Sequence, residues 1–219
     1  MRKRVLFFSI FSLFLLSISA KDKQPEWISD YKNIFPDSDY LTQRGTGESA
    51  EKAKADATAM LARYFQMNVK ANLSTTLTSI SSDTAVSETT TVIDEVTVQS
   101  DVKFFTLEYS DPWYNKKEKK WYCVAYINRK NAWIQYQPQI ESSKKTFEGL
   151  LENAVAEDDL FLKMELYKTV WKQGEEVLKK LEYGRIISPS EEKQYQSLRD
   201  EISTIPSKHT EVINSISVL

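Results

Sequence analysis

Hydrophobic positions are concentrated at the start of the chain, in a nearly continuous run that follows three basic residues. Apolar residues extend from Val5 to Leu16, and small residues follow up to Ala20. This order is typical of a secretory signal peptide, because the run is shorter than the ~20 apolar residues that cross a bilayer. We predict a signal peptide over residues 1–20, cleaved near residues 19–20, and a periplasmic or secreted product. An uncleaved membrane anchor is the alternative.

Residues 21–39 are polar and contain prolines, with isolated apolar anchors, and this composition predicts an extended arm laid on a core. Tyr40–Arg44 is expected to form a short strand. Two glycines follow, and Ser49 is a favourable N-cap residue. Apolar positions then alternate by three and four residues, which predicts an amphipathic helix over Ser49–Ala71 that packs on a sheet. The face expected to be buried comprises Ala50, Ala53, Ala57, Met60, Tyr64, Met67 and Ala71.

Serine, threonine and valine dominate residues 72–100. Alternation with a period of two at Leu73–Leu77, and again at Val92–Val98, predicts strands because β-branched residues favour extended backbone. Residues 79–91 are polar and are expected to form a loop. Helical structure near Val92 is the open alternative.

Two runs of β-branched and aromatic residues, Val102–Tyr114 and Lys120–Asn128, predict a β-hairpin. The intervening residues 115–119 are polar and largely basic, so they are expected to form an exposed turn. Pro112 has no backbone N–H, which places it at a sheet edge or a bulge.

Helical periodicity replaces the strand pattern after Arg129 and continues to Leu219. Apolar residues step by four and three from Leu160 to Leu181, and Gly184 is expected to end this helix as its left-handed cap. The sequence Ser188–Glu191 then has the N-cap, proline and acidic residue of a new helix start. The face expected to be buried in that next helix comprises Tyr195, Leu198, Ile202 and Ile205.

The predicted fold class is therefore α+β, with one long helix packed on a small antiparallel sheet and an α-helical hairpin region after it. We place the boundary of the mature chain's two domains between residues 135 and 136. The α+β domain covers residues 21–135, and the α-helical region covers residues 136–219.

Composition excludes several classes of function. The chain has 29 Lys+Arg against 31 Asp+Glu, so it has no broad cationic surface for nucleic acid or anionic lipid. Only 5 glycines are available for phosphate-binding loops, and one His and one Cys cannot form a metal cluster. We expect no cofactor and no metal. The single Cys123 is far from the end of the signal segment, so we expect no lipid anchor.

Several motifs have a structural explanation that we prefer to a chemical one. Gly45 and Gly47 precede a helix but lack the remaining features of a nucleotide-binding loop. We therefore expect them to form a structural turn and not an anion-binding site. The acidic residues at positions 157–159 are expected to cap a helix. His209 has no second ligand near it and is expected at the surface. Cys123 is expected to be a small buried residue.

The hairpin carries the best candidate for binding. Trp113, Tyr114, Trp121 and Tyr122 lie close to its turn, and large aromatic side chains with polar groups are typical of binding surfaces. Side chains alternate along a strand, so Trp121 and Tyr122 lie on opposite faces and one of them is expected to stay accessible. Cross-strand pairing that only stabilises the sheet is the alternative.

Short motifs from Pro25 to Arg129 resemble a known domain. They comprise Pro25, Glu26, Trp27, Tyr40, Leu41, Gly45, Gly47, Ser49, the alanines at 50, 53 and 57, Trp113, Trp121, Tyr122, Val124, Ile127, Asn128 and Arg129. The pattern is similar to the lipoprotein-20-like envelope domain, related to the N-terminal domain of flagellar assembly protein T, over about residues 25–135. The resemblance implies an exported α+β module of bacterial envelopes with no enzymatic activity. Many members of this family are lipidated. We do not extend lipidation to this chain, because it has no cysteine at the end of the signal segment.

Together these inferences predict an exported, non-catalytic envelope protein that acts as a binding or assembly module in the bacterial periplasm. Its expected partner is an envelope protein or a peptidoglycan-associated molecule. A flagellar assembly or motility scaffold is one alternative. A periplasmic hydrolase that uses Glu108 and Asp111 is the other. The sequence names no ligand and sets no oligomeric state.

Overall fold

The computed structural model describes residues 24–83 and 106–217, in two compact units that meet between Ile34 and Phe35 in the sequence. The predicted signal peptide, the predicted strand at Val92–Val98 and most of the predicted loop at 79–91 lie outside the described residues. In the first unit, residues Glu26–Ile34 form helix α1, with a kink at Asp30. The extended arm predicted here is wrong, because apolar residues at positions 27, 28, 31 and 34 have helical spacing.

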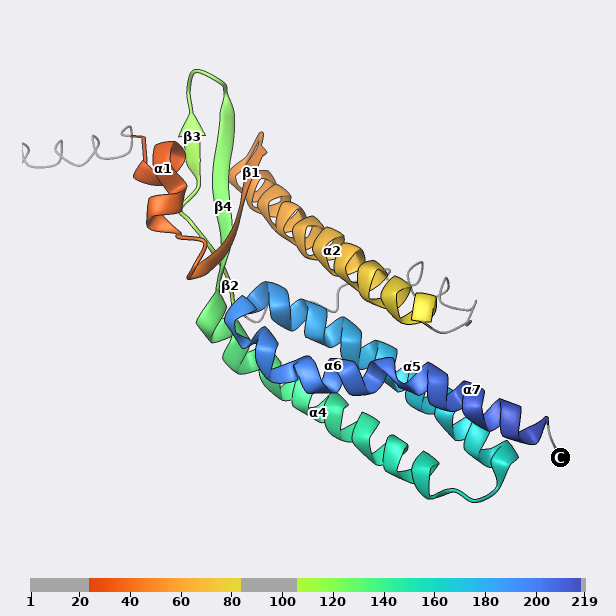
Figure 1. The fold of residues 1–219 in the computed structure, drawn as a ribbon. Coiled ribbons are helices and arrows are strands. Elements are labelled where there is room, and N and C mark those ends of the chain that lie inside the picture. The colour runs from red at the N-terminus through yellow and green to blue at the C-terminus, as the bar shows by residue number, and fades with distance from the viewer. Residues whose placement is uncertain (1–23, 84–105, 218–219) are drawn as a thin grey trace, which may run out of the picture. The chain divides into compact units, whose positions relative to one another are not determined.

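The second unit contains a four-stranded antiparallel sheet, as predicted (Figure 1). Its strands are β1 (Tyr40–Gly47), β2 (Leu107–Tyr109), β3 (Trp113–Asn115) and β4 (Lys120–Asn128). The central strand is β4, which pairs with β1 along one edge and with β2 and then β3 along the other. Pro112 lies in the break between β2 and β3, where no ladder hydrogen bond is needed from it.

Helix α2 (Ala50–Asp83) begins where the sequence predicts and packs on β1 and β4. It continues for twelve residues beyond Ala71, so the predicted strand at Leu73–Leu77 is wrong. Leucines four residues apart fit the helical period as well as they fit alternation, and packing against helix α5 (Leu160–Ile187) selects the helix. The buried side chains are Ala53, Ala57, Leu61, Phe65, Val69, Leu73, Leu77 and Ile80.

The buried face of α2 also differs from the predicted one. From Ala53 to Leu77, successive buried positions are four residues apart, so the stripe turns by about 40° at each step and by about 240° over this range. This turning lets one helix face the sheet first and α5 afterwards. Met60, Tyr64 and Met67, which were expected to be buried, are 37%, 37% and 72% exposed.

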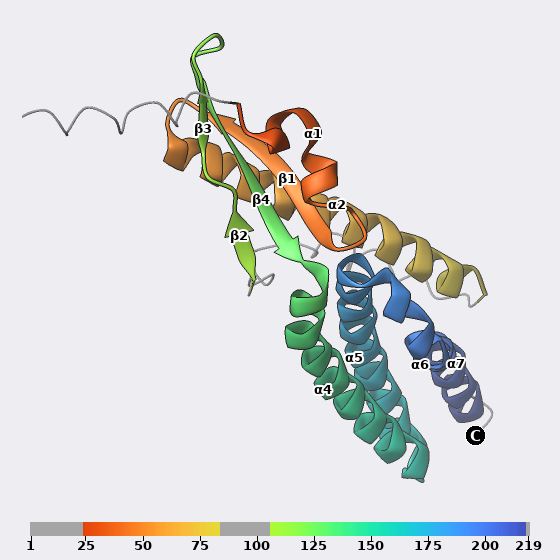
Figure 2. The same cartoon turned by 90° about the vertical axis from the view of Figure 1, so that its left-hand side faces the viewer.

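The predicted helical region is confirmed over residues 129–216. It consists of α4 (Arg129–Ala156), α5, the 3₁₀ helix η1 (Pro189–Tyr195), α6 (Gln196–Ser203) and α7 (Ile205–Ile216). Helices α4 and α5 pack side by side, and the segment from η1 to α7 returns along α5 (Figure 2). The face predicted from Tyr195, Leu198, Ile202 and Ile205 is buried.

Gly184 does not end α5, which continues to Ile187. A Cβ atom at Gly184 would lie 2.8 Å from Cδ1 of Ile140 and 3.2 Å from Cζ3 of Trp133, so this glycine allows α4 to approach α5 closely. The next helix does begin at Pro189 as predicted. Ser188 is its N-cap residue, although its side chain makes no capping hydrogen bond.

Two apolar clusters hold the second unit together. One joins α2 and the sheet to the end of α5, through Tyr183, Ile186 and Ile187. The other joins α4, α5 and the C-terminal helices to the later part of α2. The domain boundary between residues 135 and 136 stays a prediction. Within the described ranges, no helix combines the length and apolar character needed to span a membrane.

Candidate functional site

The turn between β3 and β4 is closed by local hydrogen bonds. The side-chain oxygen of Asn115 accepts from the backbone N–H groups of Lys117 and Glu118, at 3.0 and 3.3 Å. Lys119 has a φ of 55°, in the left-handed region that reverses the chain before β4. The basic turn predicted for residues 115–119 is therefore present, and it fixes the register of the two strands.

That register brings the four predicted site residues together in two cross-strand pairs. Trp113 lies opposite Tyr122 with 6.2 Å between ring centroids, and Tyr114 lies opposite Trp121 with 5.3 Å. Residues that are directly opposite share a face, and neighbours along a strand alternate, so the two pairs lie on opposite faces of the hairpin. We call these four residues the aromatic hairpin end.

None of the four side chains is buried. Tyr114 is 38% exposed, and the other three are partly exposed. The next residues of β4, Cys123, Val124 and Ala125, have no exposed surface. Complete burial along β4 therefore begins only at Cys123.

On the face that carries Trp121, the position of α2 accounts for the change. Gly47, the last residue of β1, pairs with Trp121, and α2 begins only at Ala50. Gly45 and Gly47 lie directly under the first turns of α2, since a Cβ atom on either would come within 2.7 Å of the helix backbone. The two glycines serve close packing of helix on sheet, and β1 runs through them beyond its predicted end at Arg44. The intervening Thr46 N–H donates to Asp56 at 2.9 Å, so it is engaged within the protein.

Polar and charged groups surround the aromatic hairpin end. The Tyr122 hydroxyl donates to the Glu118 carboxylate, and this hydrogen bond is the main reason that the pKa of Tyr122 is raised. The guanidinium of Arg44 lies 5.8 Å from the centroid of the Tyr122 ring. The exposed turn adds the lysines at positions 116, 117, 119 and 120. The surface thus combines aromatic area with positive charge.

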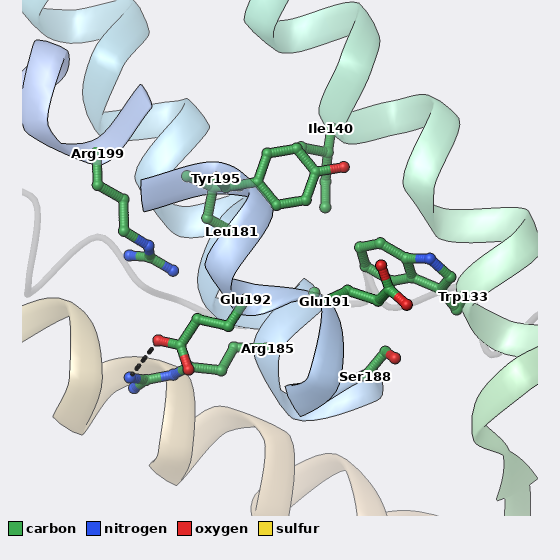
Figure 3. A pocket seen from close by; sticks show the side chains of 10 residues that line it. Trp133, Ile140, Leu181, Arg185, Ser188, Glu191, Glu192, Tyr195 and Arg199 are labelled. Carbon is green, nitrogen blue, oxygen red and sulfur yellow. Dashed lines mark hydrogen bonds and ion pairs between the residues drawn. The ribbon is translucent and has the colours of Figure 1, made fainter. Parts of the chain in front are cut away.

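A small pocket lies elsewhere, between α4, α5 and η1, and has room for about one water molecule (Figure 3). The charged side chains around it bind one another. Arg185 contacts Glu192 at 3.3 Å and Glu182 at 2.9 Å, and Arg199 donates to Glu182 at 2.6 Å. These ion pairs hold η1 and α6 against α5, so the role of the charged side chains is structural.

Two acidic residues on α5 are buried, which their sequence did not predict. Glu182 is 1% exposed and is held by Arg185 and Arg199. Glu175 is 9% exposed, and burial, followed by the nearby charge of Glu176, raises its pKa to about 7. Both lie within the apolar stripe of α5, and this position in the sequence could have indicated that they are buried.

The other candidate residues occupy ordinary structural positions. Glu108 and Asp111 are exposed, and the Glu108 carboxylate accepts from the Tyr126 hydroxyl at 3.1 Å. The acids before α5 cap it as predicted, since Asp159 accepts from the N–H of Leu162 at 3.0 Å. His209 is partly exposed on α7. Cys123 is buried as predicted, and burial raises its pKa.

Among the described residues, no group of three His, Cys, Asp or Glu side chains is placed to hold a metal ion. Comparison with known proteins gives one result. Residues 25–127 match the LPP20 lipoprotein family, and this segment contains the aromatic hairpin end. No curated protein and no solved structure matches the chain. The relation to flagellar assembly protein T stays a prediction.

Proposed function

We propose that this envelope-associated protein is a non-catalytic binding or assembly module of the bacterial periplasm, because residues 25–127 match the LPP20 lipoprotein family. The family supports the envelope association. The periplasmic location rests on the signal-like sequence of residues 1–20. The proposal includes no lipid anchor, because the one cysteine, Cys123, is buried in β4.

The observation that carries the proposal is the aromatic hairpin end. Four aromatic side chains lie on two short, paired strands with a fixed turn, and each keeps part of its surface exposed. Cross-strand contacts already restrict their rotamers, so a partner that packs on them removes little additional conformational freedom. Tryptophan and tyrosine in such positions commonly dominate binding energy.

The experiment compares two tyrosines of equal exposure. Tyr114 is 38% exposed within the aromatic hairpin end, and Tyr109 is 37% exposed in β2 of the same sheet. We expect Tyr114→Ala to weaken capture of an envelope protein or a peptidoglycan-associated partner by about 1–3 kcal/mol, and Tyr109→Ala to leave capture within about 0.5 kcal/mol of the wild type. Equal effects of the two substitutions would remove the support for this surface.

A role as a scaffold in flagellar assembly is a narrower form of the same proposal. A strain that lacks the protein would then lose motility, and Tyr114→Ala would reduce motility while Tyr109→Ala would preserve it. Normal motility in the deletion strain would exclude this form and leave the general proposal in place.

A further inference from the structure

A second exposed surface lies at the connection between α4 and α5. Val155, Phe161 and Leu162 are 57%, 65% and 51% exposed there, while Leu151 and Ala154, which precede them on α4, are buried. Three large apolar side chains, each more than half exposed, therefore gather around one short connection, and exposed apolar groups of this kind commonly mark interaction sites. We call them, with the acids described next, the acidic apolar tip.

Negative charge surrounds these three side chains. Between residues 152 and 165 there are five carboxylates and one lysine. The connection is ordered by its own hydrogen bonds, because Glu157 accepts from the N–H of Asp159 at 2.9 Å and Asp159 caps α5. The side chain of Asp158 is exposed and makes no contribution to these caps.

The turn that adjoins the aromatic hairpin end has the opposite charge. Residues 113–122, which include the four aromatic residues and the turn, contain four lysines and one glutamate. Within the second unit, the turn of the hairpin and the acidic apolar tip lie at opposite ends, as both views show (Figures 1 and 2). Helix α4 alone is about 42 Å long, so one molecule cannot bring its two surfaces together.

We propose that the acidic apolar tip of one copy docks on the aromatic hairpin end of a second copy. This inference rests on the proposed function, since it names the occupant of the same surface. Phe161 and Leu162 would pack on the exposed aromatic rings, and the flanking carboxylates would face the lysines of the turn. Opposite charge in this arrangement accelerates encounter and fixes orientation. The contact is heterologous, so it leaves one surface of each kind free and permits head-to-tail chains.

Two variants separate the surfaces, and a third is a matched control. The hairpin variant combines Tyr114→Ala with Lys117→Glu. The tip variant combines Phe161→Ser with Asp158→Lys. The control is Met67→Ser, because Met67 is 72% exposed on α2 and belongs to neither surface. All substituted side chains are exposed, so circular dichroism and urea unfolding are expected to show wild-type folding.

Sedimentation velocity over a range of concentrations is the measurement. We expect the wild-type protein to form species larger than dimers at low salt and to dissociate as salt rises. The hairpin variant and the tip variant should each remain monomeric, with the association constant lowered at least tenfold. An equimolar mixture of the two retains one intact hairpin end and one intact tip, so it should form 1:1 dimers and nothing larger. Met67→Ser should associate as the wild type does.

Three results would overturn the proposal. The wild type could stay monomeric at every concentration, the mixture could stay monomeric, or the control could lose association as fully as the tip variant does. Failure here is distinct from failure of the proposed function. If the wild type is monomeric but Tyr114→Ala still weakens capture of an envelope partner, the hairpin end binds a different molecule and only the self-association is refuted.

Discussion

Substitution of Gly45 by alanine tests how α2 sits on the sheet. Gly45 lies in β1 opposite Cys123, under the first turns of the helix. An added Cβ atom would lie 2.1 Å from the backbone nitrogen of Ala57, 2.4 Å from the carbonyl oxygen of Ala53 and 2.7 Å from Cα of Ala57. All three are backbone atoms, so no side-chain rotation can relieve the contact.

The size of the effect follows from these distances. Ordinary contacts of a Cβ atom begin at 3.4 Å, so helix and strand must separate by more than an ångström. Separation would loosen Leu61 and Ala57, which have no exposed surface and pack in the cluster with Ala125 and Ile127. Overpacking in a core commonly costs about 1–3 kcal/mol, and we expect Gly45→Ala to reach at least about 3 kcal/mol because the obstacle is backbone.

Gly149→Ala is the matched control, since a Cβ atom at Gly149 meets nothing within 4 Å. Gly149 lies in the interior of α4, where alanine is favoured over glycine by up to about 1 kcal/mol. Urea unfolding followed by circular dichroism should therefore show opposite shifts for Gly45→Ala and Gly149→Ala. A Gly45→Ala protein within about 0.5 kcal/mol of the wild type would refute the described packing of α2 on β1.

Three further substitutions test other parts of the second unit by the same unfolding assay. Arg129 donates to the carbonyl oxygens of Asp37, Ile186 and Ile187, so Arg129→Met should lower the free energy of unfolding by about 2–4 kcal/mol, and an unchanged midpoint would contradict this role. Glu175 holds its proton up to about pH 7 in the folded state, whereas its ordinary pKa is 4.5, so stability should fall as pH rises from about 4.5 to 7. Glu175→Gln should make the unfolding free energy less dependent on pH over this window, and an equal slope in both proteins would disprove the assignment. Glu182→Ala leaves two arginines without their shared carboxylate, and we expect a loss of about 3–5 kcal/mol; a loss below about 1 kcal/mol would show that the ion pairs contribute little.

Local patterns in the sequence were sufficient to predict several structural elements. Ser49 marks the start of α2, since its hydroxyl accepts from the N–H of Lys52 at 3.2 Å. The polar turn at residues 115–119 sets the hairpin register and therefore the pairing of the four aromatic residues. These features depend on neighbours in the chain, which a sequence pattern records directly.

Features that depend on distant contacts were not predictable in the same way. Leu73 and Leu77 fit a strand and a helix equally well, and α5 decides between them. Gly184 has the usual identity of a helix cap but serves close packing on Ile140. The exposure of Met67 on α2 could not be predicted from the sequence. The buried stripe of α2 turns from the sheet to α5, and only the fold shows that α2 packs on α5.

Site-specific photocrosslinking in intact cells shows directly whether a partner binds at the aromatic hairpin end. A photoreactive phenylalanine analogue is placed at Tyr114 in one strain and at Tyr109 in another, two positions with matched exposure in one sheet. We expect a discrete crosslinked product from position 114, which shifts in mass when the partner is removed or tagged, and little product from position 109. Equal crosslinking from both positions, or a product from position 109 alone, would contradict the assignment of the aromatic hairpin end as the binding surface.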